Sequence, residues 1–450
     1  MSIDNDNTGD SGCWTTVWTA MPQVAWAEAD HLPPARFARF RGATLRQTVR
    51  LCRVSSEAKP SEDKRDKSDS SEVEPSEDKK TRRIRLRFTN SFGTSELCIT
   101  RATVAIPQRP PGNGDDDNDN DDTAHISGSR FVDPATLRPV LFSGQPSATV
   151  PPGGLLLSDP VSISSLPADT PDLSISLYLA EGLLTPPITT HPGSRTQSWL
   201  CVSNQTASCS LRDGRGLCSV LHWYFLAGVE EWTAEPQQTI VLLGDSITDG
   251  RCSTNNGNDR WPDLLRARLQ ASGSLPMGTS VTLLNQAAGG NCLLRDGSGG
   301  PALLARFDRD VLAQPGVTGV LVCGGINDIG TATDHDTPLV VRGLIATYEA
   351  VRERSTTAGL TALFATITPF GGPGQVYASA PAREAARQAV NAWIRSTQAG
   401  RVVDFDAMLR DPDEPARLLP AYDSRDHLHP NVAGFQAMAD GFPVEMLGLC

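Results

Sequence analysis

The second half of the chain alternates short apolar runs with segments of helical periodicity, and this alternation constrains the fold more than any other feature. The apolar runs cover residues 239–243, 281–284, 317–322, 363–367 and 402–405. Helical patterns lie between and after them, near residues 260–271, 301–313, 338–357, 382–398 and 431–439, and Asp259 is a candidate cap for the first. Such a repeat predicts an α/β domain over residues 236–450, with a parallel sheet covered by helices on both faces.

The first half has the period of two that is typical of β-strands. Three runs place apolar side chains on one face and mostly polar ones on the other: Leu45, Val49 and Leu51; Ile84, Leu86 and Phe88; and Leu173, Ile175, Leu177 and Leu179. Turn-forming sequences such as Pro151-Pro152-Gly153-Gly154 separate these runs. We therefore expect an all-β sandwich or jelly-roll-like domain over residues 13–234, built from half-buried strands.

Two polar inserts interrupt the expected β-domain. Residues 55–81 are almost wholly Ser, Glu, Lys and Asp, and residues 112–125 begin with a run of Gly, Asp and Asn. Neither insert contains enough apolar surface to offset the entropy of ordering it, so both are predicted to be disordered. The aspartate run lacks the glycine and the terminal glutamate of an EF-hand loop, which favours a solvated acidic loop over a calcium site.

Charge and composition exclude several classes of partner. The net charge of −12 disfavours nucleic acid, because phosphates would be repelled. The sequence has neither a visible signal peptide nor an apolar stretch long enough to span a bilayer, so we expect no membrane partner. The expected location is cytoplasmic, or secreted if a leader is missing. A disulfide among Cys201, Cys209 and Cys218 is the less favoured alternative, because cytosolic thiols stay reduced.

Small polar groups follow three of the predicted strands, at the edge of the sheet where ligands bind in this class of fold. The first strand runs into Gly244-Asp245-Ser246, the second into residues 285–290, and the third into residues 324–328. A glycine before Ser246 allows a sharp turn that presents the hydroxyl at this edge. A serine in this place can also simply cap the next segment, so the other groups must decide between the two interpretations.

The segment Asp426-His427-Leu428-His429 supplies what a serine nucleophile needs. A hydroxyl requires an adjacent base, and histidine suits this task because its pKa is near neutrality. A carboxylate three residues before His429 can reach the second ring nitrogen and fix the tautomer. His427 is the weaker candidate base, because adjacent side chains point apart. A metal site built from Asp423, Asp426, His427 and His429 fits the residue types but is the less favoured interpretation.

At these residues the chain resembles the SGNH (GDSL-type) hydrolase superfamily. Four blocks occur in the family's order over residues 237–445, namely GDSITDG, NQAAGG, GGIND and DHLHP. The resemblance implies a three-layer α/β/α, flavodoxin-like domain that needs neither cofactor nor metal. It also implies Ser246 as nucleophile, His429 and Asp426 as its base and acid, and an oxyanion hole made by Ser246, Gly290 and Asn327.

The blocks contain one departure from the family and several residues with simpler roles. Ala287 stands where many relatives have glycine, which is tolerated unless the backbone there has a positive φ. Asp245 and Asp249 are expected to stabilise the turn around Ser246, and Asp328 the loop of the third block. Trp261 is expected in the core.

The resemblance leaves three functions to compare. The leading hypothesis is a serine esterase that hydrolyses short acyl esters of a small molecule or a carbohydrate. The first alternative is an acyltransferase with the same triad. The second is a carbohydrate-binding protein with a weak or inactive hydrolase domain. The first half resembles the β-domain of some bacterial and fungal relatives, through Trp14 with Trp18, TLRQTVRL, RFTNSFG and SDPVSIS, and a structural role for it is favoured over glycan binding.

Overall fold

Antiparallel strands account for the first half of the chain. The computed structural model describes residues 12–25, 31–55, 82–109, 126–163, 171–212, 216–234, 237–273, 275–276, 279–397 and 401–448. One sheet has the order β1 (Cys13–Thr19), β19 (Leu226–Thr233), β5 (Arg83–Thr89) and β12 (Leu155–Leu157), with β13 (Val161–Ser162) also paired to β5. A six-stranded sheet has the order β10 (Arg138–Val140), β7 (Arg101–Ala105), β14 (Asp172–Leu179), β3 (Ala43–Arg50), β16 (Ser198–Val202) and β17 (Cys218–Val220).

These two sheets share one apolar core, so the predicted sandwich is present. Leu86 and Phe88 of β5 belong to the same buried cluster as Leu45 of β3 and Leu177 of β14. The expectation of half-buried strands is wrong for the central pair, because loops cover their second face. Arg46 of β3 is only 1% exposed, and its guanidinium donates to Ser176 Oγ at 2.8 Å and to two backbone carbonyl oxygens.

Shorter elements complete the β-domain. A three-stranded sheet has the order β18 (Trp223–Tyr224), β15 (Thr189–His191) and β2 (Gln23–Val24). Two pairs are formed by β11 (Ala148–Val150) with β6 (Leu97–Ile99), and by β8 (Pro107–Gln108) with β9 (Phe131–Val132). Cys201, Cys209 and Cys218 form no disulfide in this part of the described chain.

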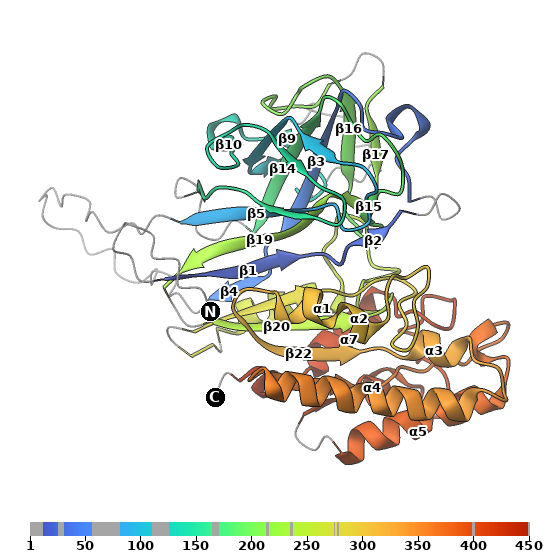
Figure 1. Cartoon of the computed structure of the whole chain (residues 1–450). Helices are drawn as coiled ribbons and strands as arrows, with labels where there is room; N and C mark the ends of the chain where they lie inside the picture. Colours follow the sequence, from blue (N-terminus) through green and yellow to red (C-terminus); the bar gives the residue numbers. More distant parts are fainter. Residues whose placement is uncertain are drawn as a thin grey trace, which may run out of the picture.

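The second half contains the parallel sheet that the sequence predicts. Its strands have the order β24 (Val402–Val403), β23 (Thr361–Ala365), β22 (Val317–Cys323), β20 (Gln237–Gly244) and β21 (Ser280–Asn285). Counted along the chain this is the order 2-1-3-4-5 read from the β21 side, which is that of flavodoxin-like folds. The architecture is the expected three-layer α/β/α arrangement (Figure 1).

The helices pack in two groups against this sheet. Helix α1 (Trp261–Ser272) contacts α7 (Val432–Gly441), and α4 (Thr337–Thr357) contacts α5 (Pro381–Thr397) (Figure 1). The predicted helix near 301–313 is α2 (Leu303–Phe307) followed by a π-helical turn, Asp308–Leu312. Short helices α3 (Ile326–Gly330) and α6 (Phe405–Leu409) were not predicted. Asp259 does not cap α1, since Arg260 occupies that position and Asp259 accepts from the Thr254 N–H.

One strand from the first half joins the second. Strand β4 (Arg53–Ser55) pairs antiparallel with β21 and forms the last strand of the otherwise parallel sheet. Strand β1 also contacts β21, so the β-domain lies along this side of the α/β sheet (Figure 1). The inserts expected to be disordered lie outside the described residues, apart from Ser55. No helix within the described ranges is long and apolar enough to cross a membrane.

Candidate active site

Ser246 lies in the tight turn that follows β20. A side chain at Gly244 would come within 2.7 Å of Thr248 and 3.0 Å of the Cys323 carbonyl, so only glycine fits there. The Asp245 carboxylate accepts from the Ile247 N–H at 3.1 Å, and the Asp249 N–H donates to the Asp245 carbonyl at 2.9 Å. These bonds hold Ser246 at the carboxyl edge of the sheet, where it is 9% exposed.

A continuous hydrogen-bond chain joins Ser246 to the loop before α7. Ser246 Oγ lies 2.8 Å from His429 Nε2, and His429 Nδ1 lies 2.6 Å from Asp426 Oδ2. The second carboxylate oxygen of Asp426 accepts from the backbone N–H groups of Leu428 and His429, at 3.0 and 2.8 Å. The three residues therefore lie in the order of a serine hydrolase triad, although Ser246 and His429 are far apart in sequence.

The hydrogen bonds to Asp426 favour its ionised form. Burial alone would raise the pKa of Asp426, but the bonds from the His429 ring and from the two backbone N–H groups lower it well below the usual value. An ionised Asp426 next to Nδ1 favours the tautomer with the proton on that nitrogen, in which Nε2 can accept the proton of Ser246.

His427 does not take part in this chain. Its Nδ1 lies 2.6 Å from Asp423 Oδ2, and its N–H donates to Asp423 Oδ1 at 3.0 Å. His427 therefore forms a separate pair with Asp423, and the geometry gives no reason to treat it as the base for Ser246.

The three N–H groups that the resemblance assigns to an oxyanion hole are those of Ser246, Gly290 and the Asn327 side chain. In the described part of the chain the backbone N–H groups of Ser246 and Gly290 donate to no other group. Gly290 is exposed and has a φ of 74°, a backbone conformation that glycine adopts freely. The Asn327 amide nitrogen donates one hydrogen to the Asn291 carbonyl at 2.9 Å and retains a second. Ala287 does not have a positive φ, so its departure from the family causes no strain.

Tyr377, which the sequence analysis missed, fixes the orientation of the Asn327 amide. Its hydroxyl donates to Asn327 Oδ1 at 2.8 Å, which forces the amide nitrogen toward Asn291. A side chain at Gly330 would come within 2.2 Å of the Tyr377 ring, so the glycine makes room for the ring. Gln375 accepts from the Tyr377 N–H and donates to the Asp426 carbonyl. The segment 375–377 thus touches both the triad loop and the Asn327 amide, and no sequence pattern marks it.

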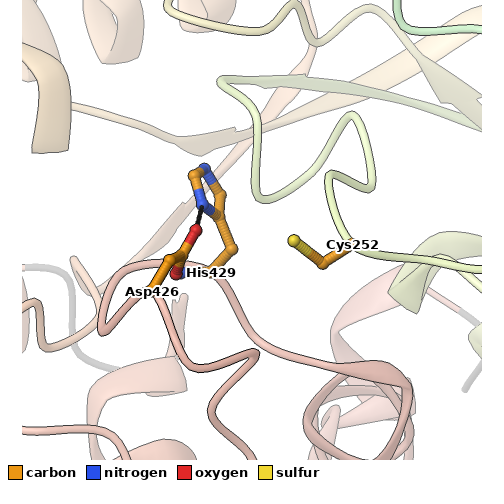
Figure 2. A group of neighbouring side chains, drawn as sticks. All are labelled: Cys252, Asp426 and His429. Carbon is orange, nitrogen blue, oxygen red and sulfur yellow. Dashed lines mark hydrogen bonds and ion pairs between the residues drawn. The ribbon is translucent and has the colours of Figure 1, made fainter.

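A thiol lies beside the histidine–aspartate pair. Donor atoms of Cys252, Asp426 and His429 all lie within 4.8 Å of one another, and Cys252 is exposed (Figure 2). Thiolate, carboxylate and imidazole are suitable zinc ligands. Both His429 nitrogens, however, are already hydrogen-bonded to Ser246 and Asp426. A metal here would have to break the triad, so the group is better described as a triad with a neighbouring thiol.

The carboxylates of Asp245 and Asp328 accept hydrogen bonds from backbone N–H groups of nearby turns and loops. Burial raises the pKa of Asp245 to about 7, and its carboxylate accepts a hydrogen bond from the Ile247 N–H. Asp328 accepts from the N–H groups of Leu293 and Leu294, at 2.9 and 3.1 Å, and so connects the third block to the loop after the second. Trp261 is fully buried against Phe405 and Phe442, as expected of a core residue.

Comparison with known proteins finds a family match for the α/β half of the chain. Residues 242–437 match the model of the GDSL-like Lipase/Acylhydrolase family. A G-D-S-L family protein from Desulfitobacterium hafniense is 22% identical, with a TM-score of 0.34, and the match covers 45% of this chain and 97% of that one. An acetylxylan esterase from Geobacillus stearothermophilus is 22% identical, with a TM-score of 0.33, and that match covers 47% of this chain and 94% of the esterase.

A GDSL-like lipase from Bacteroides thetaiotaomicron is 16% identical, with a TM-score of 0.34, and the match covers 47% of this chain and 88% of that one. Likenesses at this level carry no conclusion about substrate. No curated protein matches the chain. The family match begins within β20 and ends within α7, so it covers the α/β half of the chain and none of the β-domain. Residues 242–437 thus match a GDSL-like lipase/acylhydrolase domain, which supports a carboxylic ester hydrolase.

Proposed function

We propose that the chain hydrolyses esters of short carboxylic acids through an acyl-enzyme on Ser246. The observation that carries the proposal is the hydrogen-bond chain from Ser246 Oγ through His429 to Asp426, with distances of 2.8 and 2.6 Å. Such a chain makes a hydroxyl nucleophilic near neutral pH, because the imidazole takes its proton during attack.

In the first half of the reaction, Ser246 Oγ attacks the ester carbonyl carbon while His429 Nε2 takes the hydroxyl proton. The imidazolium then gives this proton to the departing alkoxide, and the acyl group stays on Oγ. In the second half a water molecule replaces the alcohol, loses a proton to His429 and attacks the acyl carbon. The carboxylic acid leaves as Oγ regains its proton.

The oxyanion that forms in each half would receive hydrogen bonds from Ser246 N–H, Gly290 N–H and the second Asn327 amide hydrogen. One donor of this kind contributes about 2.7–4 kcal/mol to transition-state stabilisation in a well-studied protease. Fixed donors act in this way because they need no reorganisation when the charge develops.

The surroundings of Ser246 favour a short acyl group. Gly289 and Gly290 are exposed on one side of the site, and Cys252 is exposed beside the His429–Asp426 pair. Small and polar groups of this kind offer little apolar surface for a long chain, whose binding depends on buried apolar area.

The tryptophans of the described β-domain give no support to glycan binding. Trp18, Trp223 and Trp232 are at most 9% exposed. Trp14 packs against Trp232 and under the Arg85 guanidinium, and Trp199 donates to the Gly128 carbonyl. A flat exposed aromatic surface, which carbohydrate-binding sites commonly use, is therefore not formed by these side chains.

The test compares wild type with Ser246→Ala on p-nitrophenyl esters from acetate to octanoate. We expect the acetate ester to be the best substrate and the alanine variant to lose at least about 1,000-fold in kcat. A serine-directed phosphonate should add once to wild type, at Ser246, and not to the variant. Retained turnover in Ser246→Ala would disprove the mechanism. Products formed with added alcohols would distinguish hydrolysis from acyl transfer.

A further inference from the structure

The β-domain places one side chain directly against the loop that carries Ser246. His191, the last residue of β15, is 3% exposed, and its Nε2 lies 3.0 Å from Asp249 Oδ1. Asp249 is three residues beyond Ser246 and is itself 2% exposed. The contact is therefore buried, and it joins the two halves of the chain at the nucleophile turn.

Asp249 also contacts the loop that carries Gly289 and Gly290. Its second carboxylate oxygen, Oδ2, accepts from the Gly289 N–H at 3.2 Å, one residue before Gly290. The path from the β-domain to the site thus has three members: His191, Asp249 and Gly289. Two further bonds tie the same loop to the nucleophile turn, from the Ala288 N–H to the Gly244 carbonyl at 3.2 Å and from the Asn285 amide to the Thr248 carbonyl at 2.8 Å.

Both ring nitrogens of His191 have hydrogen-bond partners. Nδ1 faces the Met21 carbonyl oxygen at 3.0 Å, which can only accept, and Nε2 faces a carboxylate. Burial would raise the pKa of Asp249, but His191, Arg260 and Arg195 together lower it below the usual value, so the carboxylate is ionised. His191 and the ionised Asp249 carboxylate are therefore joined by a buried hydrogen bond.

The chain around His191 is shaped to fit Asp249. A side chain at Gly193 would come within 1.9 Å of Asp249 Oδ2, so only glycine allows this approach. The His191 ring stacks on Trp223 with centroids 5.6 Å apart, and Arg260 of the hydrolase domain donates to the carbonyl oxygens of Gly193 and Ser194. Segment 191–194 of the β-domain therefore packs closely against Asp249 through His191 and Gly193.

We propose that His191 is a positioning residue for ester hydrolysis, through which the β-domain holds the Gly289–Gly290 loop in place by way of Asp249. The proposal rests on the proposed function, because it requires Gly290 to donate to an oxyanion. Its consequence is that the N-terminal domain is a part of the catalytic apparatus, although Ser246, His429 and Gly290 come from the second domain.

The first test measures His191→Ala on the acetate ester. We expect kcat to fall about 10- to 100-fold, since small misplacements of a catalytic donor have effects of this size, and KM to change much less. The rate of phosphonate addition to Ser246 should fall in parallel, because that reaction also develops negative charge beside Gly290. His191→Gln, which keeps one donor and leaves a smaller cavity, should show a reduced kcat with a fold closer to wild type.

Thr16→Val is the matched control. Thr16 is fully buried and donates to Gln314 Oε1 at 3.3 Å, so the variant also removes a buried side-chain contact between the domains. Gln314 lies before β22, at the opposite end of the strands from Ser246. This variant should lower the melting temperature without lowering kcat.

Variants of Asp249 distinguish a positioning role of His191 from a merely structural one. Asp249→Ala breaks both contacts and should match His191→Ala in kcat, while the double variant should be no worse than either single one. Asp249→Asn keeps an oxygen for the Gly289 N–H and turns an amide N–H toward His191, whose neutral ring can accept it. We expect its kcat to recover at least about tenfold over Asp249→Ala.

Two results would overturn the proposal while leaving the esterase function intact. One is a His191→Ala kcat equal to that of Thr16→Val. The other is independent, multiplicative losses for His191→Ala and Asp249→Ala. In both cases Ser246→Ala, measured beside them, would be inactive. Activity in Ser246→Ala would instead overturn the proposed function itself.

Discussion

The hydroxyl of Tyr377 donates to Oδ1 of Asn327 at 2.8 Å and so determines which side of that amide faces Asn291. Tyr377→Phe removes this donor and allows the amide to rotate. Because a net hydrogen bond of this kind contributes about 1 kcal/mol, we expect kcat to fall roughly fivefold to tenfold with KM nearly unchanged. Steady-state kinetics on the acetate ester measure both values.

Gly330→Ala should reproduce the Tyr377→Phe defect, because its new methyl group would push the Tyr377 ring away from Asn327. Tyr178→Phe in the β-domain is the control for losing a tyrosine hydroxyl. An unchanged kcat in both Tyr377→Phe and Gly330→Ala would show that Asn327 needs no such support.

Replacing Asp426 by asparagine should keep the loop but disable the base. The amide oxygen can still accept from the backbone N–H groups of Leu428 and His429, while its nitrogen no longer accepts from His429 Nδ1–H. The ring then favours the tautomer with a proton on Nε2, which cannot take one from Ser246. We expect a loss of about 10,000-fold in kcat, as for the equivalent change in a protease, with a melting temperature close to wild type.

The buried carboxyl of Asp245 should make the protein less stable as the pH rises from about 4 to about 7. Burial raises its pKa to about 7 in the folded state, so the native chain keeps a proton that the unfolded chain releases near pH 4. Stability from this group therefore falls across that window and is constant above it. Asp245→Asn should be more stable than wild type at pH 8, by at most on the order of 4 kcal/mol, and similar to it at pH 4.

Denaturant unfolding at both pH values measures this difference. Asp334→Asn, at an exposed position, is the control for removing one negative charge. A stability difference between wild type and Asp245→Asn that does not change with pH would contradict the expectation.

Alkylation of Cys252 should inhibit the enzyme. The exposed thiol lies within 4.8 Å of the donor atoms of Asp426 and His429, so an added acetamide group would occupy space that an ester needs (Figure 2). Iodoacetamide should therefore abolish most of the wild-type activity, and Cys252→Ser should resist it. Peptide mass spectrometry separates this reaction from alkylation of the exposed Cys13 and Cys209. Equal inhibition of both proteins would place the sensitive thiol elsewhere.

The sequence predicts the α/β half well because that half is built from local patterns. Each strand of the parallel sheet lies within two residues of its predicted position, and the residues of the four blocks meet at one edge, since the carboxyl ends of parallel strands do so. The triad follows from spacing, because Asp426 and His429 are three residues apart. The roles of Ser246, Gly290 and Asn327 remain predictions for kinetics to test.

What the sequence does not predict are contacts made by residues with no pattern of their own. Tyr377 lies on a short turn, and His191 lies in the other half of the chain, 58 residues from Asp249. Only the packing of the two halves brings His191 to its partner. Strand β4 could not be predicted for the same reason. Its three residues are too few to show a period, and their partner in β21 is more than 200 positions away.

Strand β4 has a consequence for dividing the chain. A fragment that begins at Gln237 would lack the strand that pairs with β21, and it would also lack β1, which contacts β21. The backbone N–H and C=O groups along β21 would then be open to pairing with another molecule, which is the usual route by which an unprotected strand edge causes self-association. The hydrolase half is thus not a self-contained module, and shortening the gene at the apparent boundary would yield an aggregating product.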